Sequence, residues 1–195
     1  MSPRQASIAR ETLETRIAIE LALDGSGQSE VSSGISFLDH MLGALAKHAR
    51  FDLKLSCTGD LQVDDHHTVE DCALALGQAL DQALGARRGI ARFGSAFAPL
   101  DEALARAVVD LSGRPCAVVE LGLAREALGQ LACENVPHFF ASLATTGRLA
   151  LHLDVLRGAN DHHRAEAAFK AVALALRQAV RVEGPDQVPS TKGVL

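Results

Sequence analysis

Two sets of residues that can ligate a metal ion stand in the two halves of the chain. The sets share one composition, three histidines and one glutamate, and comprise His40, His66, His67 and Glu70, and then His138, His162, His163 and Glu166. The first histidines of the two sets are 98 positions apart, and the other three pairs are each 96 apart. Scattered surface histidines would not repeat at a near-constant offset. We therefore interpret them as two copies of one metal-ligand set.

The spacing within each copy predicts how the ligands are presented. The second histidine and the glutamate are four residues apart, as in His66 and Glu70. At the start of a helix this spacing places both side chains on one face, about 5–6 Å apart at Cβ, so that one ion can take both. His67 and His163 point about 100° further around the helix. We expect each ion to take a histidine and a glutamate from one half, and further histidines from the other half or from another subunit.

The ligand types suit a catalytic ion better than a structural one. Three imidazoles and one carboxylate leave open positions on an octahedral ion. Imidazole suits Zn, Fe, Ni and Co, and carboxylate also suits Mn, so the ligands alone leave the metal open. Asp65 and Asp161 precede the paired histidines, and we expect them to cap the helices or to orient an imidazole.

The apolar pattern predicts the elements that carry these residues. In the first half, alternation predicts one strand over residues 14–23 and another over residues 51–57, and a turn after the first of these predicts a strand that pairs with it and runs through Val31. Helical spacing predicts helices over residues 37–49 and 68–84. In the second half, the same patterns predict strands over residues 103–111, 116–123 and 149–155, and helices over residues 137–146 and 165–182. Each half is therefore predicted to be a ββαβα unit.

The similarity of the halves predicts a duplicated α+β domain. Residues 17–21 resemble residues 117–121 at an offset of 100. We predict a single domain over residues 1–195, made of two tandem repeats at about 7–88 and 89–183 and a tail at 184–195. The sheets and helices of the repeats are expected to pack around a pseudo-two-fold axis.

Composition narrows the class of protein. Hydrophobic residues make up 48% of the 195 residues and charged residues 22%, as in soluble globular proteins. The net charge of −5 argues against a general nucleic-acid surface. The first five residues lack an apolar signal core and no stretch of 18 apolar residues occurs, so we expect a cytoplasmic protein without membrane segments. The four cysteines form no C-x-x-C motif and are expected to be reduced thiols.

Six short motifs carry a family resemblance that covers nearly the whole chain. They lie at residues 10–15, 34–42, 64–71, 112–115, 160–163 and 189–193, and together they resemble imidazoleglycerol-phosphate dehydratases of histidine biosynthesis. One departure is Ser36, where the family usually has proline. The resemblance implies a fold similar to the ribosomal-protein-domain-2 type, and conversion of imidazole glycerol phosphate to imidazole acetol phosphate.

The resemblance also implies a cofactor, an assembly and substrate contacts. Family members use two Mn²⁺ per active site and form 24-subunit shells with sites at subunit contacts. Glu14 resembles the family's substrate-contacting glutamate, and the positions that match its phosphate contacts are Arg92, Arg114, Ser190 and Lys192. These residues have no twins in the other half that are expected to serve the same role.

The chemistry of the implied reaction explains a duplicated ligand set. The proton to be lost sits on a carbon without an adjacent carbonyl, so the imidazole ring must serve as the electron sink. An imidazolate could bridge two ions through its two ring nitrogens. The electron-rich ring would then expel the hydroxyl of the carbon next to it and give a diazafulvene-like intermediate. A carboxylate must then take the carbon-bound proton, and Glu14, Glu70 and Glu166 are the candidates.

Two other functions use similar ligands. A dinuclear metal hydrolase acting on a phosphoester also needs histidines, glutamates and a phosphate pocket. A non-catalytic metal-storage shell would turn over nothing. A di-iron carboxylate bundle does not fit, because it uses Glu-x-x-His pairs on long helices, whereas this chain has His-x-x-x-Glu with strands between its helices.

Overall fold

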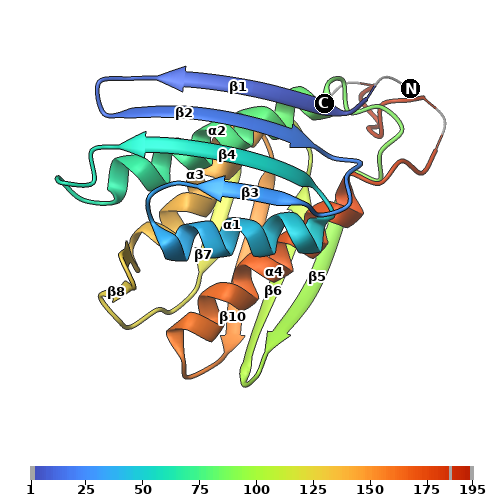
Figure 1. Ribbon diagram of the computed structural model, residues 1–195. Coiled ribbons are helices and arrows are strands. Elements are labelled where there is room, and N and C mark those ends of the chain that lie inside the picture. Colours follow the sequence, from blue (N-terminus) through green and yellow to red (C-terminus); the bar gives the residue numbers. More distant parts are fainter. Residues whose placement is uncertain (1–2, 185, 194–195) are drawn as a thin grey trace.

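The computed structural model describes residues 3–184 and 186–193, and it shows one order of elements twice (Figure 1). The first half contains β1 (Gln5–Glu11), β2 (Thr15–Ala22), β3 (Ser29–Ser32), α1 (Ser36–Ala49), β4 (Asp52–Gly59) and α2 (His66–Leu84). The second half contains β5 (Phe93–Leu100), β6 (Ala103–Asp110), β7 (Cys116–Glu120), the short β8 (Ala127–Leu128) and β9 (Leu131–Ala132), α3 (Asn135–Gly147), β10 (Ala150–Arg157) and α4 (Asp161–Ala179). Among the described residues, no helix is both long and apolar enough to cross a membrane.

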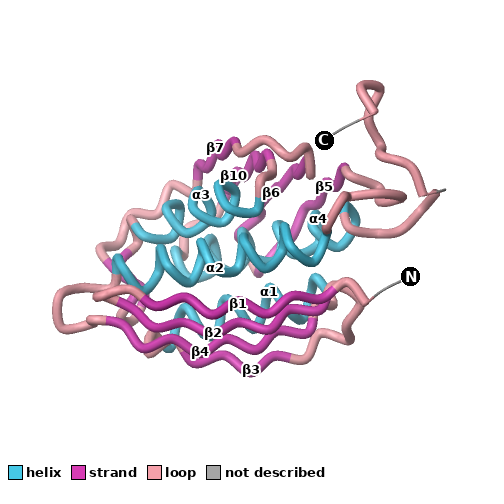
Figure 2. Tube along the Cα trace, turned by 90° about the horizontal axis from the view of Figure 1, so that it is seen from above, coloured by secondary structure: helices cyan, strands magenta, loops and turns pink. Residues whose placement is uncertain are grey.

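The two halves form two equivalent four-stranded sheets. Their orders are β1-β2-β4-β3 and β5-β6-β10-β7, and in each sheet only the last pair is parallel. Figure 2 shows the sheets on the two outer sides of the molecule and the four helices between them. The predicted α+β fold with a duplicated half-domain is confirmed, while the repeat limits at about residues 88 and 183 stay a prediction.

The number of strands in each half was predicted wrongly. Each half is βββαβα, because β1 and β5 precede the predicted elements. Both are edge strands whose sequences hide the usual alternation. In β5 the inner positions are the small residues Ala96 and Ala98, whereas the large Phe93 and Phe97 face outward. An inverted pattern of this kind does not predict a half-buried strand.

The offset of 100 between residues 17–21 and 117–121 was also a wrong alignment. Residues 17–21 lie in β2, whereas residues 117–120 lie in β7, which pairs in parallel with β10 as β3 does with β4. The register shows that Ile17 corresponds to Ala105, an offset of 88, since Ile17 pairs with Arg10 and Cys57 while Ala105 pairs with Ala98 and Val155. The halves differ because the second carries the β8–β9 hairpin between its third strand and first helix.

Helices from opposite halves pack against each other and so bring the two ligand sets together. The pairs α1–α4 and α2–α3 are in contact, which is the arrangement expected of a pseudo-two-fold axis. The helices α2 and α3 approach closely at Gly77, where a Cβ atom would lie only 2.5 Å from the carbonyl oxygen of Leu143. Phe139, Phe140 and Phe169 fill the centre, with ring centroids 4.6–5.5 Å apart. This packing places the beginnings of the paired helices side by side.

Candidate metal centres and active site

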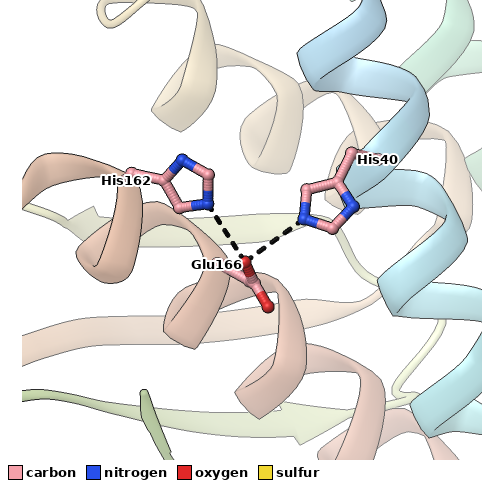
Figure 3. Close-up of side chains that lie close together, drawn as sticks. All are labelled: His40, His162 and Glu166. Atoms are coloured by element: carbon pink, nitrogen blue, oxygen red, sulfur yellow. Dashed lines mark hydrogen bonds and ion pairs between the residues drawn. The ribbon is translucent and has the colours of Figure 1, made fainter. Parts of the chain in front are cut away.

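The first cluster of ligands joins α1 to the start of α4. The Nε2 atoms of His40 and His162 each lie 3.3 Å from Oε2 of Glu166. Figure 3 shows both imidazoles directed at this one carboxylate. Because His162 and Glu166 are four residues apart on α4, the helix alone brings them together, and packing of α1 on α4 adds His40. His40 comes from one half and the other two ligands from the other half, as predicted.

The carboxylate of Glu166 is held in its charged form. Burial opposes its ionisation, but Lys170, whose Nζ donates to Oε1 at 2.6 Å, and His40 outweigh burial and lower the pKa of Glu166. Lys170 stands one turn after Glu166 on the same helix and leaves Oε2 to the two histidines. The cluster therefore presents one anionic oxygen and two imidazole nitrogens at a common point.

The second cluster joins the start of α2 to α3 in the same way. His66 and Glu70 come from α2 and His138 from α3, and one ligand atom of each lies within 4.8 Å of the others. His138 Nε2 is 3.2 Å from Glu70 Oε1, and the rings of His66 and His138 stack with centroids 4.7 Å apart. Leu74 stands at the position of Lys170, so Glu70 has no lysine beside it on the helix. The two clusters have the same ligands but a different charge balance.

Neighbouring side chains fix the orientation of both helix-borne histidines. Nδ1 of His66 donates to Oδ1 of Asn135 at 3.0 Å, which leaves Nε2 as the ring nitrogen available to a cation. Asn135 is itself held by Asp65, which accepts from its Nδ2 at 2.9 Å. His162 instead meets the edge of Phe37, with ring centroids 5.1 Å apart. Phe37 and Asn135 each stand three residues before the first histidine of their set.

Asp65 and Asp161 do not cap their helices with side-chain hydrogen bonds. Asp64 and Asn160 take this role, since their side chains accept from the backbone N–H of His66 and His162 at 2.8 and 2.9 Å. Asp161 is buried and accepts from the N–H groups of residues 124 and 125, and Asp65 accepts from that of residue 132. The two aspartates thus hold the segment with the β8–β9 hairpin over the helix starts, and Asp65 orients His66 only through Asn135.

His67 and His163 lie outside both clusters. His67 is placed between Asp60, 3.0 Å from its Nδ1, and Glu14, 3.7 Å from its Nε2. Its pKa is raised, first by the hydrogen bond with Asp60 and then by the charge of Glu14. The predicted divergence of the adjacent histidines is therefore observed, and His67 Nε2 faces out of its own cluster.

His163 has equivalent surroundings. Glu102 lies 2.7 Å from its Nδ1 and Asp101 lies 3.8 Å from its Nε2. The pKa of His163 is raised by the bond with Glu102, and that bond, with the N–H groups of residues 160 and 159, lowers the pKa of Glu102 to about 2. Both outlying histidines are thus oriented through Nδ1 by a carboxylate and present Nε2 outward.

The predicted surroundings of Glu14 need two corrections. Glu14 lies in the turn between β1 and β2, directly before β2, and not on the strand itself. It also has a positional counterpart, because the register that equates Thr15 with Ala103 equates Glu14 with Glu102 in the β5–β6 turn. The two glutamates differ in their contacts: Glu102 bonds Nδ1 of His163, and the neighbouring Asp101 faces the Nε2 of His163 as Glu14 faces that of His67. The expectation that Glu14 is without a twin was therefore wrong in position.

The four residues matched to phosphate contacts lie around the tail. Arg92 pairs with Asp110 at 2.7 and 3.0 Å, which raises the pKa of the guanidinium, and its NH1 donates to the carbonyl of Pro189 at 2.8 Å. Ser190 follows at once, and its Oγ accepts from the N–H of Lys192 at 3.2 Å. Arg114 is exposed in the turn between β6 and β7. The guanidinium of Arg92 is therefore bonded to Asp110 and to the tail of its own chain.

Arg92 and the histidine cluster at the start of α4 lie at opposite ends of both β6 and α4. Glu102, beside His163, directly precedes β6, whereas Asp110, beside Arg92, ends it, and eight strand residues span about 26 Å. The helix α4 gives the same result, because His162 stands at its start and Ala179, whose carbonyl accepts from the N–H of Arg92, stands at its end, about 26 Å away. One chain by itself does not bring Arg92 and this cluster into one site.

A family model described as imidazoleglycerol-phosphate dehydratase matches residues 33–176, which include all eight residues of the two ligand sets. The matched segment covers well over half of the chain. The chain belongs to the imidazoleglycerol-phosphate dehydratase family. It is accordingly an enzyme of the hydro-lyase type.

Relatives and solved structures of imidazoleglycerol-phosphate dehydratases agree with this membership. The chain is 54% identical to the Saccharomyces cerevisiae protein, with 100% of both chains covered, and 57% identical to that of Candida glabrata, with 97% and 99% covered. It is 62% identical to a Phytophthora nicotianae protein, of which it spans only 42%. The Staphylococcus aureus crystal structure matches with a TM-score of 0.83 at 34% identity, covering 92% of this chain and 99% of that one. The crystal structure of the Pyrococcus furiosus enzyme in complex with (S)-C348 matches with a TM-score of 0.82 at 37% identity, covering 96% of this chain and 100% of that one.

Several residues around the dehydratase site were not predicted from the sequence. Lys170 could have been found, because it stands four residues after Glu166 on a predicted helix. Asn135, Asp60 and Glu102 come from other elements than the histidines they contact, and nothing in their local sequence indicates those contacts.

Proposed function

We propose that this chain dehydrates imidazole glycerol phosphate to imidazole acetol phosphate in histidine biosynthesis. The observation that carries the proposal is the pair of equivalent clusters, each with two imidazoles and one carboxylate, in a member of this family. An imidazole substrate has two ring nitrogens, and two equivalent cation sites suit such a ring.

The clusters fit divalent cations. Two ligand atoms that each lie about 2.1 Å from an ion, at right angles, are about 3 Å apart. The observed nitrogen–oxygen separations of 3.2 and 3.3 Å approach this value. We propose that the clusters hold two Mn²⁺ per active site. The ligands would be His40, His162 and Glu166 in one cluster, and His66, Glu70 and His138 in the other, with His67 and His163 completing the clusters of neighbouring subunits.

The residues of the chain divide the remaining tasks. Bound cations would supply positive charge that stabilises an electron-rich imidazole ring. Glu166 is bonded to Lys170 and two histidines, and Glu70 contacts His138, so both are engaged as ligands. Glu14 is 53% exposed and touches only the outward Nε2 of His67. We therefore propose Glu14 as the carboxylate that takes the carbon-bound proton.

We propose that the complete site forms between subunits of a shell, which would have 24 subunits as the family resemblance implies. The distance between Arg92 and the cluster at the start of α4 supports this, as does an apolar outer face on the second sheet. Phe93, Phe97, Val108 and Val118 are 40–59% exposed on this face. The register places Val108 and Val118 on either side of His152 in one row across the sheet. Such a patch is typical of a surface that another protein molecule covers.

Removing a positive charge from the proposed phosphate contacts should weaken substrate binding. We expect Arg114→Ala and Lys192→Ala each to raise KM by about 10-fold or more with little change in kcat, because a charge-assisted hydrogen bond contributes about 1.5–3 kcal/mol. Initial-rate kinetics with the phosphorylated substrate measure the effect. Lys54→Ala, which removes an exposed lysine of β4, is the matched control and should leave KM unchanged. An unchanged KM in both variants would remove the two residues from the phosphate site.

The proposed reaction is tested by identifying the product. Purified protein with Mn²⁺ should convert imidazole glycerol phosphate to the ketone imidazole acetol phosphate and leave the phosphate ester intact. Release of inorganic phosphate without ketone would favour the dinuclear hydrolase instead, and absence of any turnover would favour a storage shell.

A further inference from the structure

A buried polar network ties the first hairpin to α2. Asp71 lies on α2, one turn after His67, and its side chain is only 7% exposed. Its Oδ2 forms an ion pair with Arg10 of β1 and accepts a hydrogen bond from the hydroxyl of Thr15, the first residue of β2. Thr15 is itself 3% exposed. Three elements, β1, β2 and α2, thus meet at one carboxylate.

The same network continues into the turn that carries Glu14. Thr12 Oγ1 accepts from the N–H groups of Glu14 and Thr15 at 3.1 and 3.0 Å, and its hydroxyl lies 3.4 Å from that of Thr15. The carbonyl of Glu14 accepts from the N–H of Asp60 at 3.1 Å. Both backbone polar groups of Glu14 are therefore bonded, and the turn is fixed to the segment and the helix that hold His67.

The second half has no such network at the equivalent positions. Strand register equates Arg10 and Thr15 with Ala98 and Ala103, and the ligand offset of 96 equates Asp71 with Ala167. All three alanines are buried. The same fold thus forms with three small apolar residues at these positions.

This comparison separates a role in the active site from a role in folding. Burying an ion pair costs desolvation energy, and replacing one by apolar residues is often neutral for stability. The second half shows that the fold does not need the pair. In the second half the side chain of Glu102 itself fixes the turn, since it accepts from the N–H groups of residues 159 and 160 and contacts His163. In the first half the network fixes the turn instead, so that the side chain of Glu14 stays exposed, 3.7 Å from His67.

We infer that Arg10, Thr15 and Asp71 are positioning residues that hold Glu14 in place for proton transfer. The inference rests on the proposed function, in which Glu14 contacts the substrate. The network makes the two halves unequal: the clusters are duplicated, but the first half ties its turn to α2 through the partly buried Arg10–Asp71 ion pair, whereas the second half ties its turn to α4 through Glu102 itself.

The test uses Asp71→Asn and the triple variant Arg10→Ala/Thr15→Ala/Asp71→Ala, which copies the second half. In Mn²⁺-loaded protein we expect kcat to fall by between about 10- and 100-fold, because a small misplacement of a reacting group lowers the rate by this amount. KM and the number of bound ions should stay unchanged. Hydrogen exchange, measured without substrate, should become faster at the amides of Glu14 and Thr15 in both variants. Arg16→Ala removes an exposed ion pair of the same hairpin and should change none of these values.

A double-mutant cycle shows whether the network acts through Glu14. In a Glu14→Gln background, Asp71→Asn should lower kcat no further, because positioning a missing carboxylate has no effect. A full additional loss, loss of bound metal, or unchanged exchange at the turn would each overturn the inference. If the wild-type protein does not dehydrate the substrate, the proposed function fails, and the exchange measurement alone decides whether the network fixes the turn.

Discussion

Glu166→Gln is expected to abolish most of the dehydration and to remove one of two bound ions. Glu166 supplies the only anionic oxygen of its cluster, and both histidines converge on it. An amide is a poorer ligand than a carboxylate for Mn²⁺. Since a catalytic metal ion contributes several kcal/mol of charge stabilisation, kcat should fall by about 1,000-fold or more.

Metal analysis and kinetics on the same preparation measure both effects. The manganese content should fall from two ions to one per subunit while the far-ultraviolet circular dichroism stays unchanged. Glu20→Gln, which neutralises an exposed glutamate of β2, is the matched control and should behave as the wild type. Two bound ions and an unchanged kcat in Glu166→Gln would show that this cluster is not a metal site of the reaction.

Co-assembly of two inactive variants is expected to restore activity. Arg92 and the cluster at the start of α4 are separated by about 26 Å within one chain, measured along β6 and α4. On the proposed function, each site would therefore take its metal cluster and its phosphate contacts from different subunits. When Glu166→Gln is co-expressed with Arg114→Ala/Lys192→Ala, a fraction of the sites receives an intact cluster from one subunit and intact phosphate contacts from another.

The assay is the rate at a substrate concentration well below the wild-type KM, where the second variant alone is nearly inactive. Co-expression of Glu166→Gln with His162→Ala is the control, since both defects lie in one cluster of one chain and no combination of subunits repairs it. A co-assembled rate no greater than that of the separate variants would place the complete site within a single chain.

The ligand clusters could be predicted because their geometry is local. The spacing of four residues on a helix fixes the distance between His162 and Glu166. That His40 joins this cluster depends on the packing of α1 on α4 and could not be predicted. The divergence of His67 from its neighbour follows from the same helical geometry. Periodicity also located the four helices and the two central strands of each sheet.

The rest depended on contacts between distant segments. The edge strand β5 has small residues inside and exposed phenylalanines outside, so its apolar alternation is inverted. The distance of Arg92 from the clusters appears only when the direction of α4 is known. The network likewise joins Asp71 to Arg10 and Thr15, which are 56 positions away or more. Only the strand register of the two halves shows that the second half has alanines at the positions of Arg10 and Thr15.

These contacts also explain how a nearly symmetric fold can support an asymmetric reaction. Lys170 stands beside Glu166, while leucine stands at the matching position beside Glu70. The turn of Glu14 is held by the Asp71 network and leaves that glutamate exposed, while its counterpart Glu102 is itself bonded to the start of α4. On the proposed function, the duplicated clusters suit the two nitrogens of an imidazole, and the unequal surroundings would give the two sides of that ring different chemistry.

Metal removal and titration test the account most directly. The protein is stripped with a chelator, and formation of imidazole acetol phosphate is followed as Mn²⁺ is added back. The account predicts no dehydration by the stripped protein and a rise in activity that ends at two ions per subunit. Full activity of the stripped protein, or saturation at one ion per subunit, would contradict it.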